Sequence, residues 1–550
     1  MAMTEPLPPM PDPLFCQRVP AGLGLVVEIG CGEGALGAWL SRREPFGRRI
    51  ATEADPAAAS RATPFYESVL VQEPEAGAPV PPGSADLVIL RGVPADPAAA
   101  IRAAAKALAP EGTLLIELPN AEHWRIAETL LAGGSARIAA PAHAIAREAL
   151  LGAVRDAGLI PYDVPPQVPD LAAARAFAAK VGAATGDTEA YLRRAAPPRW
   201  LLRAGRQARA PMMLLAHVLK PVGGVNDVRM DLPLGLMATH PGVALHLAER
   251  PETPDLPPGT PRILVLHRRL LNNPGAPLFI NQFRQRGWVV VQEFDDDPAH
   301  WPVIAESNHF AFRGVHGVQT TTPKLEALFR AMNDEVMVLP NTVAELPVPA
   351  NFADPQRMTL FLGALRREED IAPFLPVLNE ILAGTGERLS VEVIYDRGTF
   401  DALATAHKRY WPLLAYPEYR NLMARSEIAF LPLSDTRFNG YKSDLKFVEC
   451  GAHRLACIAS PVVYGDTIRD GETGLIVRDP AAFGAALRGL LADPTRMQRI
   501  AQAARDWVTQ NRMMAAQVPA RMSWYRSLWD RRTELDAALL RRAPECATSG

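Results

Sequence analysis

The stretch LVVEIGCGEGALGAWL, residues 25–40, joins an apolar run, a glycine-rich turn and a run rich in alanine and leucine. The first run has the composition of a buried strand, and the last has that of a helix. Glycine at the turn allows positive φ angles and lets a ligand approach the main chain closely. The stretch therefore predicts the first strand–turn–helix unit of an α/β domain that binds a nucleotide.

The rest of the chain repeats this alternation of strand and helix. Strand-like segments lie at RRIATEA (48–54), ADLVILRG (85–92) and GTLLIELPN (112–120), and two similar α/β segments follow. Alternating strands and helices predict parallel, doubly wound sheets, so we expect an α/β fold with three Rossmann-like domains. The expected divisions are a first domain at 22–200, a linker at 201–211, a second domain at 212–354, a third at 355–515, and a C-terminal helix and tail at 516–550.

Composition excludes several classes of protein. A chain of 550 residues is too long for one hydrophobic core, in agreement with several domains. With 58 basic and 60 acidic residues, the chain lacks the excess positive charge on which general nucleic-acid binders rely, so no nucleic-acid partner is expected. The five cysteines are scattered without zinc-binding spacing, so no metal is expected.

The N-terminal residues and the apolar runs predict a location. MAMTEPLPPMPDPLF (1–15) is proline-rich and has neither the basic nor the apolar region of a signal peptide. No apolar run approaches the length of roughly 18 residues that suggests a membrane span. We expect a cytoplasmic protein that is at most peripheral, at the inner face of a membrane.

The turn VVEIGCGEG (26–34) has glycines at alternate positions, unlike the spacing of dinucleotide-binding proteins. It resembles the S-adenosylmethionine loop of class I methyltransferases, and the resemblance extends over about residues 25–160. An acidic residue ends the second strand, where this family binds the ribose hydroxyls. The resemblance implies S-adenosylmethionine as cofactor, with the binding residues Glu28, Gly30, Gly32, Gly34 and Glu53.

Other positions differ from the methyltransferase pattern. After the third strand, where the family has an aspartate, this chain has Gln72 and Glu73. After the fourth strand, LRGVPADP (90–97) lacks the acidic–histidine pair of the related subgroup. No convincing general base is left, so two hypotheses stay open for this domain: methyl transfer, or a domain that binds weakly or only packs.

A second motif lies at FNGYKSDLKFVECGAHRLACIAS, residues 438–460. It holds two of the seven lysines of the chain, and Lys442, Lys446 and Glu449 have the spacing i, i+4, i+7 that places side chains on one helix face. Two cations suit a diphosphate beside a helix N-terminus, and a carboxylate suits ribose hydroxyls. The alternative is a solvated helix face.

This motif resembles that of GT-B glycosyltransferases related to the retaining GT4 family, over about residues 260–510. LFLGALRREED (360–370) and DGETGLIV (470–477) are similar to further family segments. The resemblance implies catalytic roles for Lys446, Glu449 and Arg367, and donor-binding roles for Gly363, Arg366, Asn439, Lys442, Ser443 and Asp444. The family has a second acid eight positions before Glu449, but this chain has Tyr441 there.

The acceptor is expected in the N-terminal half of a GT-B enzyme. Arg229, His267 and Arg268 lie near predicted strand ends that could face the cleft between the halves. The run Asp295–Asp297 permits a metal site, but a loop that caps a helix fits a GT-B architecture better.

Together, the two resemblances imply a glycosyltransferase that uses a nucleotide sugar and a glycan, lipid-linked or protein acceptor in surface polysaccharide biosynthesis, with an N-terminal methyltransferase-like domain. Two alternatives remain. Methyl transfer to a glycan is the main activity in one, and the other is a non-catalytic scaffold with decayed nucleotide pockets.

Overall fold

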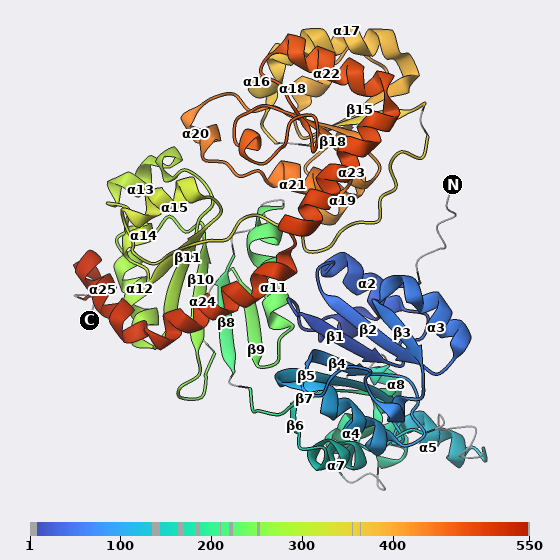
Figure 1. Cartoon of the computed structure of the whole chain (residues 1–550). Coiled ribbons are helices and arrows are strands. Elements are labelled where there is room, and N and C mark those ends of the chain that lie inside the picture. Colours follow the sequence, from blue (N-terminus) through green and yellow to red (C-terminus); the bar gives the residue numbers. More distant parts are fainter. Residues whose placement is uncertain are drawn as a thin grey trace. The chain divides into compact units, whose positions relative to one another are not determined.

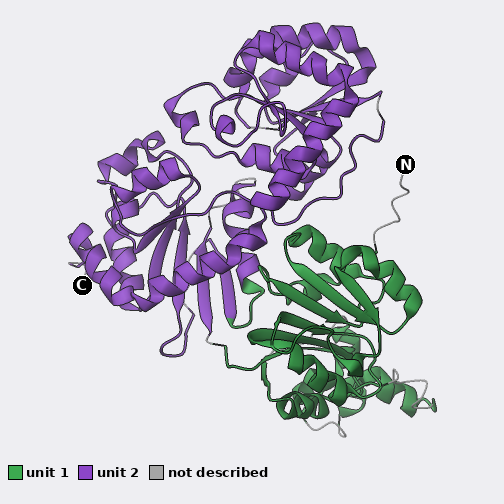
Figure 2. Cartoon of the chain, viewed as in Figure 1, with its two compact units in different colours: residues 1–210, 238–242 green, residues 211–237, 243–550 purple. Residues whose placement is uncertain are grey.

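The structure, a computed structural model, describes residues 8–134, 143–162, 170–182, 187–209, 211–218, 224–249, 254–354, 356–363 and 365–547. The chain divides into two compact units (Figures 1 and 2). Unit 1 comprises residues 1–210 and 238–242, and unit 2 comprises residues 211–237 and 243–550. The three sheets are mainly parallel and alternate with helices, which confirms the predicted α/β class with three Rossmann-like domains.

Unit 1 contains a seven-stranded sheet in the order β3-β2-β1-β4-β5-β7-β6. The neighbours from β3 to β5 pair in parallel, whereas β7 is antiparallel to both β5 and β6. The strands are β1 Leu25–Ile29, β2 Arg48–Glu53, β3 Ser68–Val71, β4 Ala85–Leu90, β5 Leu108–Pro119, β6 Ile160–Tyr162 and β7 Arg199–Gly205.

The prediction that a linker begins at residue 201 is wrong, because residues 201–205 belong to β7. This strand pairs with β5 from Leu114↔Ala204 to Pro119↔Arg199. Trp200 is buried, and its indole N–H donates to the carbonyl of Ile145 at 2.8 Å. Pairing with β5 and burial of Trp200 and Ala204 hold this segment in the sheet, although its prolines and arginines suggested a connection.

Helices cover both faces of the sheet in unit 1. Helices α1 and α2 pack through Phe15, Leu36 and Trp39 on one face, and α4 and α7 pack through Ile101 and Val154 on the other. Aspartate caps followed by proline begin α3 and α4, a sequence suited to a helix N-terminus. The helices are α1 Pro13–Cys16, α2 Ala35–Arg43, α3 Pro56–Ala62, α4 Pro97–Ala107, α5 Trp124–Leu131, α7 Arg147–Asp156, α8 Leu171–Lys180 and α10 Thr188–Ala195.

The first sheet of unit 2 has six parallel strands in the order β13-β12-β11-β10-β8-β9. They are β8 Met212–His217, β9 Val243–Ala248, β10 Arg262–His267, β11 Val289–Glu293, β12 Gly317–Thr320 and β13 Val336–Val338. The π-helix η3 Asp227–Asp231 and the helices α11 Leu232–Ala238, α12 Ala276–Gln285, α13 Pro302–Glu306, α14 Phe310–Arg313 and α15 Pro323–Arg330 accompany them.

The C-terminal segment returns to this first sheet. It forms α24 Val518–Asp530 and α25 Arg532–Arg542, and Leu539 and Cys546 belong to the same hydrophobic core as Leu264 and Val290. The two ends of unit 2 therefore share one core.

The second sheet of unit 2 is parallel, with the order β16-β15-β14-β17-β18-β19. Its strands are β14 Met358–Leu362, β15 Leu389–Ile394, β16 Lys408–Trp411, β17 Ile428–Leu431, β18 Ala456–Ala459 and β19 Leu475–Ile476. Numbered by appearance, this is the order 3-2-1-4-5-6 of a nucleotide-binding sheet, whose switch point lies between β14 and β17.

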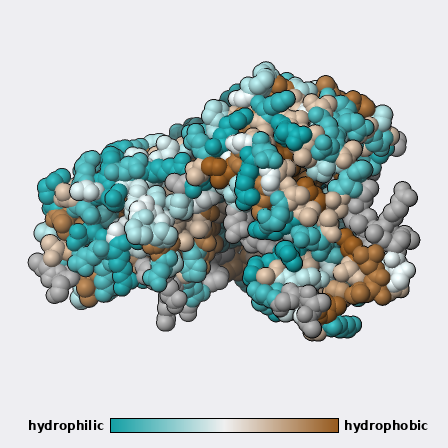
Figure 3. Space-filling model, turned by 90° about the horizontal axis from the view of Figure 1, so that it is seen from below, coloured by the Kyte–Doolittle hydropathy of each residue, from teal (hydrophilic) through white to brown (hydrophobic). Residues whose placement is uncertain are grey.

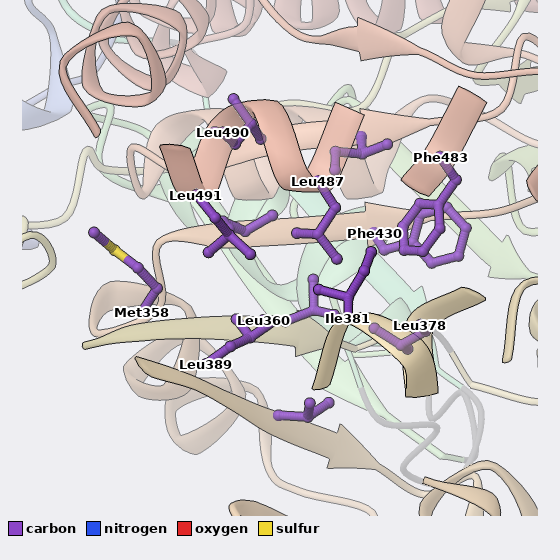
Figure 4. Packing of buried hydrophobic residues seen from close by; sticks show 14 of the residues in the cluster. Met358, Leu360, Leu378, Ile381, Leu389, Phe430, Phe483, Leu487, Leu490 and Leu491 are labelled. Carbon is purple, nitrogen blue, oxygen red and sulfur yellow. The ribbon is translucent and has the colours of Figure 1, made fainter. Parts of the chain in front are cut away.

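Helices enclose this second sheet on both faces. Figure 4 shows one face, where Leu378 and Ile381 of α17 and Phe483 and Leu487 of α22 pack against the strands. The helices are α16 Glu368–Ile371, α17 Leu375–Thr385, α18 Arg397–Ala402, α19 Tyr416–Ala424, α20 Arg437–Gly440, α21 Leu445–Ala452, α22 Pro480–Ala492 and α23 Pro494–Asn511.

The surface is mixed in hydropathy. Figure 3 shows a face on which hydrophilic residues predominate, with hydrophobic patches between them. Across the described ranges, every helix is too short or too polar to span a bilayer.

Candidate functional site

A pocket of about 240 Å³ lies within unit 2, at the carboxyl ends of both of its sheets. Gly363 follows β14 and Pro432 follows β17, so the pocket includes the switch point of the second sheet, where α/β proteins bind ligands. Arg268 follows β10 and Asp295 follows β11 of the first sheet. The remaining lining residues are Gly224, Val225, Val228, Arg229, Asp296, Asn341, Leu365, Arg367, Ile394, Leu413, Leu414, Tyr416, Tyr419, Leu431, Leu433, Lys442, Ser443, Leu445, Lys446, Glu449 and Tyr464.

Lys446 and Glu449 lie together on α21 at this pocket. The Lys446 ammonium donates to Glu449 Oε2 at 2.9 Å and to the Tyr419 hydroxyl at 2.8 Å. Glu449 is 1% exposed, whereas the Lys446 side chain is 29% exposed. Burial, followed by the nearby Glu449 carboxylate, raises the pKa of Tyr419 well above its usual range, so its hydroxyl stays protonated. The Lys446 ammonium is therefore partly exposed, while its partners Glu449 and Tyr419 are buried and hold it in place.

Lys442 lines the same pocket, but the prediction of one helix face for Lys442, Lys446 and Glu449 is wrong. Helix α21 begins at Leu445, so Lys442 precedes it. Helix α20 ends at Gly440, and a turn that contains Lys442 leads to Asp444, the N-cap of α21. Lys442 donates to both carboxylate oxygens of Asp296, at 2.7 and 2.9 Å. Burial lowers the pKa of Lys442, although Asp296 opposes this shift.

Arg367 enters the pocket from the loop after β14. Its guanidinium donates to Asp370 and to the side-chain oxygen of Asn439, both at 2.9 Å. Burial opposes ionisation of Asp370, but hydrogen bonds from Ser434 and Arg367 outweigh it and lower the pKa. Asn439 is 5% exposed and is not among the lining residues. It therefore contributes to the pocket indirectly, by accepting a hydrogen bond from the Arg367 guanidinium.

The other predicted donor residues are placed differently. Ser443 lines the pocket and accepts from the Asn341 amide at 2.7 Å. Asp444 accepts from Arg512 at 2.8 Å and from Thr467 at 2.7 Å, and it lies outside the lining. Arg366 is exposed and also outside the lining, while its backbone N–H donates to Asp396 at 2.7 Å.

Of the three residues predicted for the acceptor side, two line the pocket and one does not. Arg268 lines the pocket and forms an ion pair with Asp295 at 2.5 Å. Although Arg229 also lines the pocket, it is 2% exposed and held by Glu293 at 2.8 and 3.0 Å. His267 is fully buried outside the lining, and neither ring nitrogen has a hydrogen-bond partner among the described residues. Burial lowers the pKa of His267 to about 4, so the ring is neutral.

Several lining residues were not among the residues predicted to bind the donor or the acceptor. Tyr416 and Tyr419 stack with ring centroids 6.3 Å apart, and they begin the segment YPEYRNLMARSEIAFLPL (416–433), which resembles the nucleotide-base region of GT-B enzymes. Asp295 and Asp296 pair with Arg268 and Lys442, and their signal was a run of acids directly after a strand. Asp297 accepts from the backbone N–H of Ala299 at 3.1 Å and caps a short helix, as the capping interpretation required.

Within the described residues, no cluster of three or more His, Cys, Asp or Glu side chains is arranged to hold a metal.

The glycine loop of unit 1 follows β1 as predicted from the sequence. Gly30, Gly32 and Gly34 have φ angles of 79°, 54° and 87°, which favour glycine. A Cβ atom at Gly32 would meet no atom within 4 Å, so the backbone is open to a ligand there. Glu53 at the end of β2 accepts from the Gly32 N–H at 2.7 Å. The hydrogen bond therefore holds the loop and the Glu53 carboxylate together at the carboxyl ends of β1 and β2.

Glu28 is buried within unit 1 and has partners of its own. Tyr66 donates to Glu28 Oε2 at 2.5 Å, and Arg91 lies 3.5 Å from the other carboxylate oxygen. Burial raises the pKa of Glu28 to about 7, although Arg91 and Tyr66 oppose the shift. The Tyr66 hydroxyl also accepts from the N–H of Gly37 at 3.0 Å, which ties the start of α2 to β1.

Residues 18–164 match a family model described as a methyltransferase domain, whereas no curated protein matches the chain. Among solved structures, TarM shares 9% identity over 48% of this chain and 54% of its own, with a TM-score of 0.38. The aligned region thus spans about half of TarM.

HepE from Anabaena, solved with UDP-glucose, shares 12% identity over 57% of this chain and 99% of its own, with a TM-score of 0.40. An S-adenosylmethionine-dependent methyltransferase from Mesorhizobium loti shares 17% identity over 35% of this chain and 95% of its own, with a TM-score of 0.25. At residues 18–164, the chain carries a domain of the methyltransferase family.

Proposed function

We propose that unit 2 is a GT-B glycosyltransferase that moves a sugar from a nucleoside diphosphate donor to a glycan, lipid-linked or protein acceptor in surface polysaccharide biosynthesis. One observation carries this proposal. The pocket at the carboxyl ends of two parallel sheets combines Lys442, Lys446 and Arg367 with the buried acid Glu449 and an apolar wall. A nucleotide sugar needs these features, because it joins a flat base, a ribose and a diphosphate.

The cations would act on the leaving group. When the bond from the anomeric carbon to the diphosphate breaks, negative charge develops on the departing oxygen. Preorganised positive groups stabilise such charge without having to reorganise during the reaction. Lys446 and Arg367 are held by hydrogen bonds to Tyr419, Glu449, Asp370 and Asn439, so they meet this condition.

Glu449 and the lining apolar residues would place the nucleoside. The Glu449 carboxylate can accept from ribose hydroxyls, and Leu413, Leu414 and Ile394 provide an apolar surface for a base. Gly363 and Ser443 line the pocket next to the cations. Arg268, on the side of the first sheet, is the remaining candidate for an acceptor contact.

The experiment is a donor panel on the purified chain. UDP-, GDP- and ADP-sugars are incubated with the protein, and release of nucleoside diphosphate is followed with and without glycan acceptors. We expect turnover of one nucleotide class. The absence of both turnover and binding across the panel would contradict the proposal.

A second activity is favoured by the glycine loop of unit 1 and by the family match. We infer that Gly30, Gly32, Gly34 and Glu53 bind S-adenosylmethionine, which when bound supplies an electrophilic methyl group. Glu28 supports the loop through Tyr66 and Arg91. Calorimetry with S-adenosylmethionine tests this, because Glu53→Gln should weaken binding about tenfold, whereas the exposed Glu67→Gln should not.

We place the chain in the cytoplasm, at most peripheral to the inner face of the membrane.

A further inference from the structure

The cations that line the pocket of unit 2 differ in where their acidic partners come from. Arg229, Arg268, Arg367 and Lys446 each pair with an acid from their own half of the unit. Lys442 instead pairs with Asp296, which follows β11 of the opposite sheet. Among the described lining residues, this is the ion pair that joins the two walls of the pocket.

The contact satisfies Lys442 fully enough to compete with a ligand. Its ammonium donates to both oxygens of Asp296, and the two side chains are 23% and 5% exposed. A phosphate oxygen on Lys442 would meet this carboxylate at close range, where two anions repel strongly because little water screens them. Lys442 can therefore serve a diphosphate well only after Asp296 has withdrawn.

A second partner for Asp296 is already in place. Arg268 lies 3.5 Å from Asp296 Oδ2, on the same side of the pocket as Asp296 itself. A small shift of the carboxylate would exchange Lys442 for Arg268, so Asp296 need not lose its charge or remain unpaired.

We propose that Asp296 is a built-in counter-anion, which holds Lys442 while the pocket is empty and moves to Arg268 when the diphosphate of the donor arrives. This inference rests on the proposed function of unit 2. Asp296 thereby weakens the binding of any diphosphate, including the product, and acts only on ligands that carry one. It is a positioning residue, because it acts through Lys442.

Isothermal titration calorimetry on the full chain tests the exchange. UDP, GDP and ADP are titrated into the wild type, and the tightest binder and its nucleoside are then titrated into Asp296→Asn. We expect the dissociation constant for the diphosphate to fall about tenfold, because Lys442 loses its competing anion. The value for the nucleoside should stay the same. Lys442→Met should weaken the diphosphate, and adding Asp296→Asn to it should bring no gain.

Asp297→Asn is the matched control, because Asp297 pairs with the exposed Arg437 and lies outside the lining. Thermal unfolding checks each variant, and Asp296→Ser replaces the asparagine variant if that does not fold. If the wild type binds a diphosphate but Asp296→Asn binds it equally or less tightly, the exchange is wrong while the proposed function stands. If Lys442→Met has no effect, the exchange is likewise wrong. If none of the three diphosphates binds to the wild type, the proposed function fails as well.

Discussion

Lys446 and Glu449 are the residues on which the assignment of unit 2 depends most. Lys446→Met removes the charge but keeps the stem, and Glu449→Gln keeps the shape of the buried acid. We expect each to lower kcat for sugar transfer at least about 100-fold, since the first removes the positive charge at the leaving group and the second removes the carboxylate charge that holds Lys446 in place. Arg488→Gln is the control, because Arg488 pairs with Glu380 at an exposed position. A wild-type kcat in Lys446→Met or in Glu449→Gln would contradict the role assigned to that residue.

Glu28 predicts a pH dependence of stability for unit 1. Its pKa is raised from 4.5 to about 7 by burial, so the folded state holds a proton that the unfolded state releases above pH 4.5. The unfolding free energy therefore falls as the pH rises from about 4.5 to 7, by about 3 kcal/mol in total. Urea unfolding of the wild type at several pH values should show this decline, and Glu28→Gln should lack that part of it. Equal pH slopes in both proteins would contradict the prediction.

At the scale of elements, α24 is tied to the first sheet of unit 2 through polar groups. The Tyr525 hydroxyl donates to Gln319 at 2.7 Å, and the Gln319 amide donates to Glu293 at 2.7 Å. Tyr525→Phe would leave a buried amide oxygen unpaired, so we expect a loss of about 1–3 kcal/mol in unfolding free energy. Urea denaturation measures it, with the exposed Arg526→Ala on the same helix as control. An unchanged midpoint would contradict the prediction.

The elements also show what the sequence could predict. The glycine loop and strands such as β1 and β4 were predictable because local apolar runs and glycine spacing encode them. The start of α21 was not, because helical spacing alone continues through Lys442 while the observed cap lies at Asp444. Strand β7 was missed because its neighbour β5 is distant in sequence. The contacts of Asp296 with Lys442 and of Tyr419 with Lys446 were missed for the same reason, since such contacts form only when separate elements meet.

At the scale of the whole molecule, the chain consists of two compact units with separate hydrophobic cores, and each carries its own candidate nucleotide site. A ligand stabilises the folded state to which it binds. We therefore expect differential scanning calorimetry to show two transitions, with S-adenosylmethionine raising one and the preferred nucleoside diphosphate raising the other. Glu53→Gln should abolish only the first shift, and Lys446→Met should reduce only the second. A single transition that both ligands raise, and that both variants affect equally, would contradict this expectation. In that case the two units unfold as one cooperative body, and a ligand bound to one unit stabilises both.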